Sequence, residues 1–265
     1  LFVKMGLVRA SVAATSVLLA TIIFLGGGVL GMFHHLYFSG TPTAVIALGS
    51  VFSALEVVPL MVVGFEAYNR LKFEHRHGWQ EVYRWPFAFF TSVLVWNLVG
   101  AGLFGFLINP PLALYYMQGL NLTPVHGHTA LFGVYGMLGL GLTLFCLRVL
   151  QPGRKWKEGV LKASFWCINI GLTFMVVLSM FPIGILQAKA SIEYGTWYAR
   201  SAEFLQTPTM QTLRWMRLPG DVLFAVGALL LGWFVLGRLT GHSFEGERSL
   251  PPSRHEADDR ELAIR

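Results

Sequence analysis

The chain has 265 residues, of which 54% are hydrophobic and only 13% are charged, and its formal net charge is +6. An ordinary soluble domain carries about a quarter charged residues. This composition, with a mean hydropathy of +0.57, therefore argues against a soluble domain and indicates a membrane protein.

Apolar runs of 18 or more residues predict membrane-spanning helices. Six such runs are present, at about 11–33, 41–67, 86–108, 124–147, 161–186 and 219–239. The first is too long for a cleavable signal peptide, and no small-residue cleavage site follows it. The sequence therefore predicts an all-α fold, a polytopic transmembrane helix bundle of about six spans.

Most basic residues lie on one predicted side of the membrane, apart from those of the long loop between the fifth and sixth spans, which obeys the charge rule only weakly. They precede the first span, follow the second and the sixth, and surround the connection after the fourth, where they are Arg148, Arg154, Lys155, Lys157 and Lys162. The connections after the first and third spans carry no charge. By the positive-inside rule, both ends of the chain are expected in the cytoplasm. The positive charge thus points to a lipid bilayer and not to nucleic acid as a partner.

The chain divides into two regions of different composition. Residues 1–240 form the predicted transmembrane bundle, and residues 241–265 form a polar tail with mixed charges and two adjacent prolines. Such a segment has too few apolar residues to build a core. We expect this cytoplasmic tail to be mobile.

Four of the eight histidines lie in two short stretches, FHHLYFSG at 33–40 and VHGH at 125–128. The first span runs outward and the fourth runs inward, so both stretches are predicted at the outer ends of helices. They should lie at similar depth and form one shared site. The alternative, that each pair is simply an amphipathic element at the water boundary, stays open.

The spacing within each pair favours different chemistry. Neighbouring helical residues point about 100° apart, so His34 and His35 can reach one metal where a helix end frays. Imidazole suits iron, copper and zinc alike. His126 and His128 point roughly 200° apart, which suits two cofactors on opposite flanks of the helix. Haem groups fit because each needs an axial ligand, and Gly127 leaves room between the two.

Glu56 lies well inside the second predicted span, in FSALEVVPL. A carboxylate within a bilayer is costly and is a functional hypothesis by default. It would act as a proton carrier if neutral, or lie beside a metal if ionised. Glu66 is nearer the cytoplasmic end, where snorkelling or pairing with Arg70 explains it equally well.

The sequence contains no motif for several other kinds of chemistry. Cys146 and Cys167 fall within spans, where cysteine usually acts as a small hydrophobe. No C-x-x-C-H sequence is present, so no c-type haem is predicted on this chain. Phosphate-binding loops and nucleophile elbows are also absent from the sequence.

Three runs carry a family resemblance: HHLYFSGTPTAVIALGSVFSALEVVPL, WNLVGAGLFGFLINPP and HGHTALFGVYGMLGLGL. They closely resemble the catalytic subunit of bacterial nitric oxide reductases, in the haem-copper oxidase superfamily, and most of all the quinol-dependent single-chain type. The similarity extends from about residue 7 to 240 and includes WYARSAEF and RWMRLPGD. It implies an enzyme of the bacterial cytoplasmic (inner) membrane that reduces two nitric oxide molecules to nitrous oxide and water, with quinol as electron donor.

The resemblance also implies roles for individual residues. His34 and His35 match two of the three histidines that hold the non-haem iron. Glu56 matches the carboxylate that assists proton supply and tunes this metal. His126 matches the proximal ligand of the high-spin haem b, and His128 matches an axial ligand of the low-spin haem b.

One departure from the family is evident. Its catalytic unit has twelve spans, and this chain supplies about the last six, so the third iron histidine and other ligands belong to helices absent here. We expect an N-terminal half of the same protein, or a completing chain, as a partner. The alternatives are an oxygen-reducing haem-copper oxidase, a nitric oxide dismutase relative and a non-catalytic haem-binding membrane module.

Overall fold

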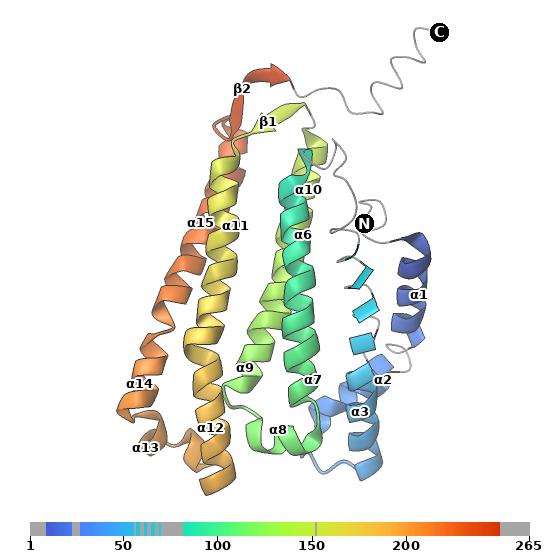
Figure 1. Ribbon diagram of the computed structural model, residues 1–265, viewed down its shortest axis with the longest axis vertical. Coiled ribbons are helices and arrows are strands. Elements are labelled where there is room, and N and C mark those ends of the chain that lie inside the picture. The colour runs from blue at the N-terminus through green and yellow to red at the C-terminus, as the bar shows by residue number, and fades with distance from the viewer. Residues whose placement is uncertain are drawn as a thin grey trace.

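A computed structural model describes residues 9–22, 27–55, 82–151 and 153–249, together with isolated residues between 57 and 69. Its elements are helical apart from two short strands (Figure 1). Glu56 lies outside the described residues, as does the tail beyond residue 249.

Four helical segments have the length and hydropathy needed to cross a membrane: Arg84–Ile108, Leu122–Leu150, Glu158–Tyr194 and Pro208–Leu239. They coincide with the last four predicted spans. Two shorter apolar helices, Ala10–Leu19 and Thr43–Leu55, lie within the first two predicted spans, which are only partly described. The prediction of an all-α, multi-pass bundle is confirmed.

The first part of the chain consists of short elements. These are α1 (Ala10–Thr21), α2 (Gly27–Gly31), the 3₁₀ turn η2 (Met32–Leu36) and α3 (Thr43–Leu55). The first long span follows as α6 (Arg84–Trp96), η3 (Asn97–Phe104) and α7 (Gly105–Ile108), and α8 (Pro111–Met117) connects it to the next. Pro110 and Pro111 end the span, because proline cannot continue the hydrogen-bond ladder of a preceding helix.

The remaining three long spans complete the bundle. They comprise α9 (Leu122–Gly127), η4 (His128–Gly136) and α10 (Met137–Leu150); α11 (Glu158–Phe174), η5 (Met175–Met180) and α12 (Phe181–Tyr194); and α14 (Pro208–Trp215) with α15 (Leu218–Leu239). The short helices η6 (Tyr198–Arg200) and α13 (Ala202–Leu205) join α12 to α14. Successive spans run in opposite directions (Figure 1).

Three of the spans contain a π-helical segment, namely η3, η4 and η5. Segments of this kind are rare and frequently occur at functional sites. η3 and η4 pack against each other: a Cβ atom added to Gly100 would lie 2.6 Å from the carbonyl carbon of Thr129. Glycine therefore permits this crossing, as small residues do between membrane helices.

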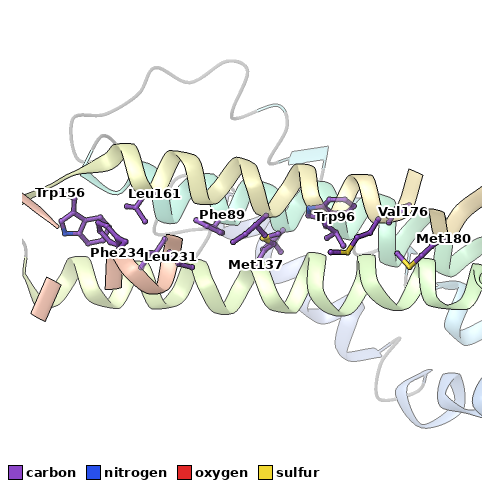
Figure 2. Packing of buried hydrophobic residues seen from close by; sticks show 14 of the residues in the cluster. Phe89, Trp96, Met137, Trp156, Leu161, Val176, Met180, Leu231 and Phe234 are labelled. Atoms are coloured by element: carbon purple, nitrogen blue, oxygen red, sulfur yellow. The ribbon is translucent and has the colours of Figure 1, made fainter. Parts of the chain in front are cut away.

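The core follows the long axis of the bundle (Figure 2). α11 and α15 run side by side, with Gly171 and Gly220 at their contact, where an added Cβ would come within 2.6 Å of the partner backbone. Buried aromatic residues fill the wider spaces toward α6, with Phe89 fully buried. Close backbone approach and aromatic filling together fix how the spans cross.

An antiparallel strand pair closes the end opposite α8 (Figure 1). β1 (Arg154–Trp156) pairs with β2 (Phe244–Ser249), and Trp156 lies opposite Phe244. The sequence analysis expected the tail from residue 241 to be mobile, and that expectation was wrong for residues 244–249. Phe244 is only 4% exposed and anchors the strand. Residues 250–265 lie outside the described part of the chain.

Candidate functional site

The two histidine stretches lie toward the same end of the bundle as α8, as the alternating directions of the spans predicted (Figure 1). His34 and His35 belong to η2, and their ring centroids are 4.0 Å apart. η2 rests directly on α3, because a Cβ atom added to Gly49 would lie 2.5 Å from the backbone nitrogen of His34. A glycine at this position lets the histidine turn approach the second span.

His126 and His128 face different neighbours. The ring of His126 lies against the preceding span, with Nδ1 2.9 Å from the Gly100 carbonyl oxygen and Cε1 2.9 Å from the position of an added Gly105 Cβ. The Nε2 atom of His128 lies 3.4 Å from Nη2 of Arg217, just before α15. The rings thus point toward separate spans, as the i, i+2 spacing predicted.

Three of the four histidines share one hydrogen-bond arrangement. Their Nδ1 atoms lie beside backbone carbonyl oxygens, at 2.6 Å for His34 with Gly31, 2.9 Å for His126 with Gly100 and 2.9 Å for His128 with Pro124. A carbonyl oxygen only accepts, so Nδ1 must carry the proton and, in the neutral ring, Nε2 keeps its lone pair. Metal-binding histidines are oriented in this way. The donor set therefore fits a haem or a metal ion.

The electrostatics of His34 connect the two stretches. Burial lowers the pKa of His34 below its ordinary value, and the charges of His35 and His126 act in the same direction. The bond to the Gly31 carbonyl opposes this lowering only in part. His126 therefore lies close enough to His34 to influence its pKa.

The described residues do not complete a metal site by themselves. They contain no group of three or more His, Cys, Asp or Glu side chains arranged to hold an ion. His34 and His35 would supply two ligands, and Glu56, which was predicted to lie beside the metal or to carry a proton, is outside the described residues. A third ligand must therefore come from elsewhere if the pair binds iron.

Glu66 is accounted for by an ion pair. The Arg9 guanidinium donates to both carboxylate oxygens of Glu66, at 2.7 and 3.2 Å, and Glu66 is 8% exposed. The pairing that the sequence analysis considered was with Arg70, which lies outside the described residues. Arg9 thus ties the start of α1 to the second predicted span.

The structure adds site residues that the sequence analysis did not single out. Gly100 and Gly105 accommodate the His126 ring, and Arg217 faces His128 while pairing with Asp221 at 3.0 Å. The sequence could have indicated them, because both glycines lie in WNLVGAGLFG and Arg217 lies in RWMRLPGD, two of the runs that carry the family resemblance. A haem iron on Nε2 of His128 would require Arg217 to move aside.

Comparison with known proteins decides the family. Residues 1–223 match the family Cytochrome C and Quinol oxidase polypeptide I. The chain belongs to this family. It is 27% identical over 213 residues to a nitric oxide reductase subunit from Stutzerimonas stutzeri, a match that covers 76% of this chain and 42% of that protein. The predicted membership of the haem-copper oxidase superfamily is confirmed.

A solved structure supports the same fold. The chain is similar to a heme-copper terminal oxidase dimer determined by cryo-EM, with a TM-score of 0.66 and 17% sequence identity. The match covers 87% of this chain and 42% of that one. The chain thus spans less than half the length of either relative.

Proposed function

We propose that this chain is part of a nitric oxide reductase, in which it supplies ligands to two haem b groups and to a non-haem iron. His126 would hold the high-spin haem, His128 the low-spin haem, and His34 with His35 the iron. The similarity to the Stutzerimonas stutzeri nitric oxide reductase supports the assignment. The complete protein would convert two nitric oxide molecules, two electrons and two protons into nitrous oxide and water.

The observation that carries this proposal is the shared orientation of the imidazoles. His34, His126 and His128 each have Nδ1 beside a backbone carbonyl oxygen at 2.6–2.9 Å, which leaves Nε2 as the atom that would bind a metal, although Nε2 of His128 lies 3.4 Å from Nη2 of Arg217. Histidines that were only interfacial would turn their polar atoms toward water. Three rings set alike at one end of the bundle favour bound cofactors.

The chain's own residues would bind, orient and supply protons. When bound, the haems and the iron supply electrons and hold the gas molecules close together. The Gly100 and Pro124 carbonyls keep the rings of His126 and His128 in one tautomer and one direction. Glu56 would deliver a proton to the departing oxygen, because no bulk water reaches a helix core at low cost.

The remaining parts of the proposal concern setting and partners. We place the protein in the bacterial cytoplasmic membrane, with both ends of this chain in the cytoplasm, on the basis of the charge distribution. Quinol is the proposed electron donor. An N-terminal half or a completing chain would supply the third iron histidine and the second axial ligand of the low-spin haem.

An oxygen-reducing oxidase is the second candidate. The matching family is that of cytochrome c and quinol oxidases, and the similar solved structure is a terminal oxidase. Against it, Glu56 in FSALEVVPL matches a carboxylate of the nitric oxide reductases, by the resemblance described above. A nitric oxide dismutase relative and a haem-binding module without turnover remain as further outcomes of the test.

Turnover of the purified full-length protein tests these candidates. It would be supplied with a reduced quinol analogue and then with nitric oxide without oxygen, or with oxygen alone, while nitrous oxide, dinitrogen and oxygen are measured. We expect nitrous oxide and one non-haem iron per two haems. Oxygen consumption without nitrous oxide would establish the oxidase, dinitrogen release the dismutase, and bound haem without turnover the module.

The His34→Ala variant provides the matched control. It should lose the non-haem iron and the activity while keeping both haems, because removing one ligand leaves the ion weakly held. A variant with full iron content and normal turnover would instead assign the histidine pair to the membrane interface.

A further inference from the structure

A polar side chain links α11 to α6 within the bundle. Asn169 of α11 accepts two hydrogen bonds at Oδ1, one from the Ser92 hydroxyl and one from the indole nitrogen of Trp96 at 2.9 Å. Its amide nitrogen donates to the Phe165 carbonyl oxygen at 2.9 Å, one turn earlier in the same helix. Both ends of the amide are therefore used, and Asn169 fixes the Trp96 ring from a neighbouring span.

Trp96 lies at a change in the backbone of the first long span. It is the last residue of α6, and the π-helical segment η3 begins at Asn97. Its ring contacts the next span, because a Cβ atom added to Gly133 of η4 would lie 2.7 Å from Cγ of Trp96. Trp96 is 8% exposed and belongs to the core (Figure 2). The ring that Asn169 holds therefore joins the start of η3 to η4.

The two glycines that surround the His126 ring lie at the other side of this π-helical segment. The Gly100 carbonyl oxygen accepts from Nδ1 of His126 at 2.9 Å, and Gly105 contacts the same ring. The Gly105 amide also donates to the Gly100 carbonyl oxygen. This is an i to i+5 hydrogen bond, the kind that defines a π-helix. A shift of η3 would therefore move the carbonyl oxygen that orients His126.

The crossing of η3 and η4 is close along its length. Trp96 contacts Gly133, Gly100 contacts Thr129, and Gly105 contacts His126. These contacts involve backbone or ring atoms and leave no room for an added Cβ. Packed elements of this kind move together, because interiors are dense and transmit strain. The position of the Trp96 ring is thus coupled to the position of the His126 ring.

We propose that Asn169 holds Trp96 and η3 in register with η4, and so sets the hydrogen bond between the Gly100 carbonyl oxygen and His126. The inference rests on the proposed function where it treats His126 as a haem ligand. Asn169 is then a positioning residue, which acts through Trp96 and the backbone of η3. The alternative is that Asn169 only strengthens the association of α6 with α11, as asparagine does between membrane helices.

The Asn169→Leu variant of the full-length protein separates these two roles. Leucine keeps the approximate volume and the helix, but it accepts no hydrogen bond from Trp96. A hydrogen bond from Nδ1 raises the basicity of a metal-bound imidazole, so a weaker bond to Gly100 should weaken the bond between His126 and the haem iron. We expect the iron–histidine stretching band in resonance Raman spectra of the reduced protein to move to lower frequency. Turnover should fall about 10-fold, the lower end of the range for groups that support a metal ligand, at unchanged haem content.

Thr173→Val is the matched control. Thr173 lies one turn further along α11 with an exposed side chain, and its hydroxyl donates to the Asn169 backbone carbonyl at 2.8 Å. Valine removes a hydrogen bond from the same turn without releasing Trp96, so the band should keep its wild-type frequency. If Asn169→Leu does not fold, Asn169→Ala takes its place with the same expected shift, because alanine has the highest helix propensity.

Trp96→Phe completes a double-mutant cycle. If Asn169 acts through the indole, the band shift caused by Asn169→Leu should largely disappear in the Trp96→Phe protein, because changes at residues in contact are not additive. A full shift in both backgrounds would overturn the route through Trp96. An unchanged band in Asn169→Leu, together with a lower unfolding temperature, would overturn the positioning role and assign Asn169 to helix association alone.

The His126→Ala protein separates failure of this inference from failure of the proposed function. If the reduced wild type shows no iron–histidine band, or if His126→Ala keeps that band, His126 is not the ligand of the high-spin haem. The proposed function would then fail, and the positioning role with it. A band that is lost in His126→Ala but unmoved in Asn169→Leu would overturn the inference about Asn169 alone.

Discussion

The two ends of the bundle differ in what surrounds their buried and half-buried nitrogen atoms. At the end with β1 and β2, Arg148 and Arg238 are 2% and 7% exposed, yet their guanidinium carbons lie 3.7 and 4.9 Å from the centroid of the Trp156 ring. At the other end, His34 and His126 present Nε2 atoms that form no hydrogen bond with the described residues. At one end aromatic faces of the chain itself cover the buried cations, whereas at the other the two imidazole nitrogens have no partner among the described residues.

At the arginine end, aromatic faces and carbonyl oxygens contact the buried guanidinium groups, although Nε of Arg148 and Nε and Nη1 of Arg238 have no hydrogen-bond partner among the described residues. Arg148 donates to the Arg154 carbonyl at 2.8 Å, and Arg238 donates to the Leu147 carbonyl at 2.7 Å. An aromatic face attracts a desolvated cation by about 2 kcal/mol or more. These contacts offset part of the cost of burial. The contrast teaches that changes at this end should affect stability, whereas changes at the histidine end should affect cofactor content and activity.

The largest expected effect is at the histidine end, in His126→Ala and His128→Ala of the full-length protein. Both should abolish turnover, but their spectra should differ because the rings face different spans. His128→Ala should remove the six-coordinate haem signal, and His126→Ala should perturb the haem that binds external ligands. Optical and paramagnetic resonance spectra check this. Identical spectra with both haems retained would contradict the assignment.

Glu56→Gln should have the next largest effect. The amide is nearly isosteric, so the fold and both haems should remain, but it cannot transfer a proton as a carboxylic acid does. Loss of such a group typically slows a reaction about 10²–10⁴-fold. Nitric oxide consumption, measured with haem and iron content, tests the prediction. Full metal content with wild-type turnover would remove Glu56 from the mechanism, and loss of iron would mean that it acts through the metal.

The architecture could be predicted from the sequence to a large extent because each span carries its own signal. The four long spans reach the required hydropathy one by one, and the alternation of their directions brings His34 near His126 without knowledge of any contact. The opposite facing of His126 and His128 follows from helical geometry alone. These predictions needed only local sequence and the dimensions of a helix.

Features that depend on side-chain contacts between distant segments could not be predicted. The stretch FEGERS lacks the alternating apolar pattern of a half-buried strand, and Phe244 is its one hydrophobic residue. Arg148 counted as a cytoplasmic cation, and only the positions of Trp156 and Arg154 explain its burial. The hydrogen bond from Asn109 to the Ser50 carbonyl oxygen likewise depends on the packing of two distant segments.

Trp156→Ala should destabilise the arginine end. It removes a fully buried indole that also contacts Phe234 at a centroid distance of 5.2 Å (Figure 2). Removal of a buried tryptophan costs about 3–5 kcal/mol, and here it also removes the aromatic face nearest to the guanidinium groups of Arg148 and Arg238. We expect a clearly lower thermal unfolding temperature in detergent, with haem content per folded protein unchanged.

Trp166→Ala is the control for this change, since Trp166 lies on the same helix as Leu161 but is 52% exposed. It should alter the unfolding temperature little. If Trp156→Ala removed haem and left the unfolding temperature unchanged, the assignment of stability to the arginine end and of cofactor content to the histidine end would be wrong.

The smallest effect is expected for Lys155→Met, at the surface of the arginine end. The Lys155 ammonium lies 2.7 Å from a Glu245 carboxylate oxygen, but both side chains are nearly half exposed, at 49% and 44%. Exposed pairs of this kind contribute about 0–1 kcal/mol, and methionine keeps the apolar stem that covers the strand. We therefore expect an unfolding temperature close to that of the wild type, at both low and high salt. A loss as large as that of Trp156→Ala would show that the ion pair, and not the Trp156–Phe244 contact, holds β2 in place.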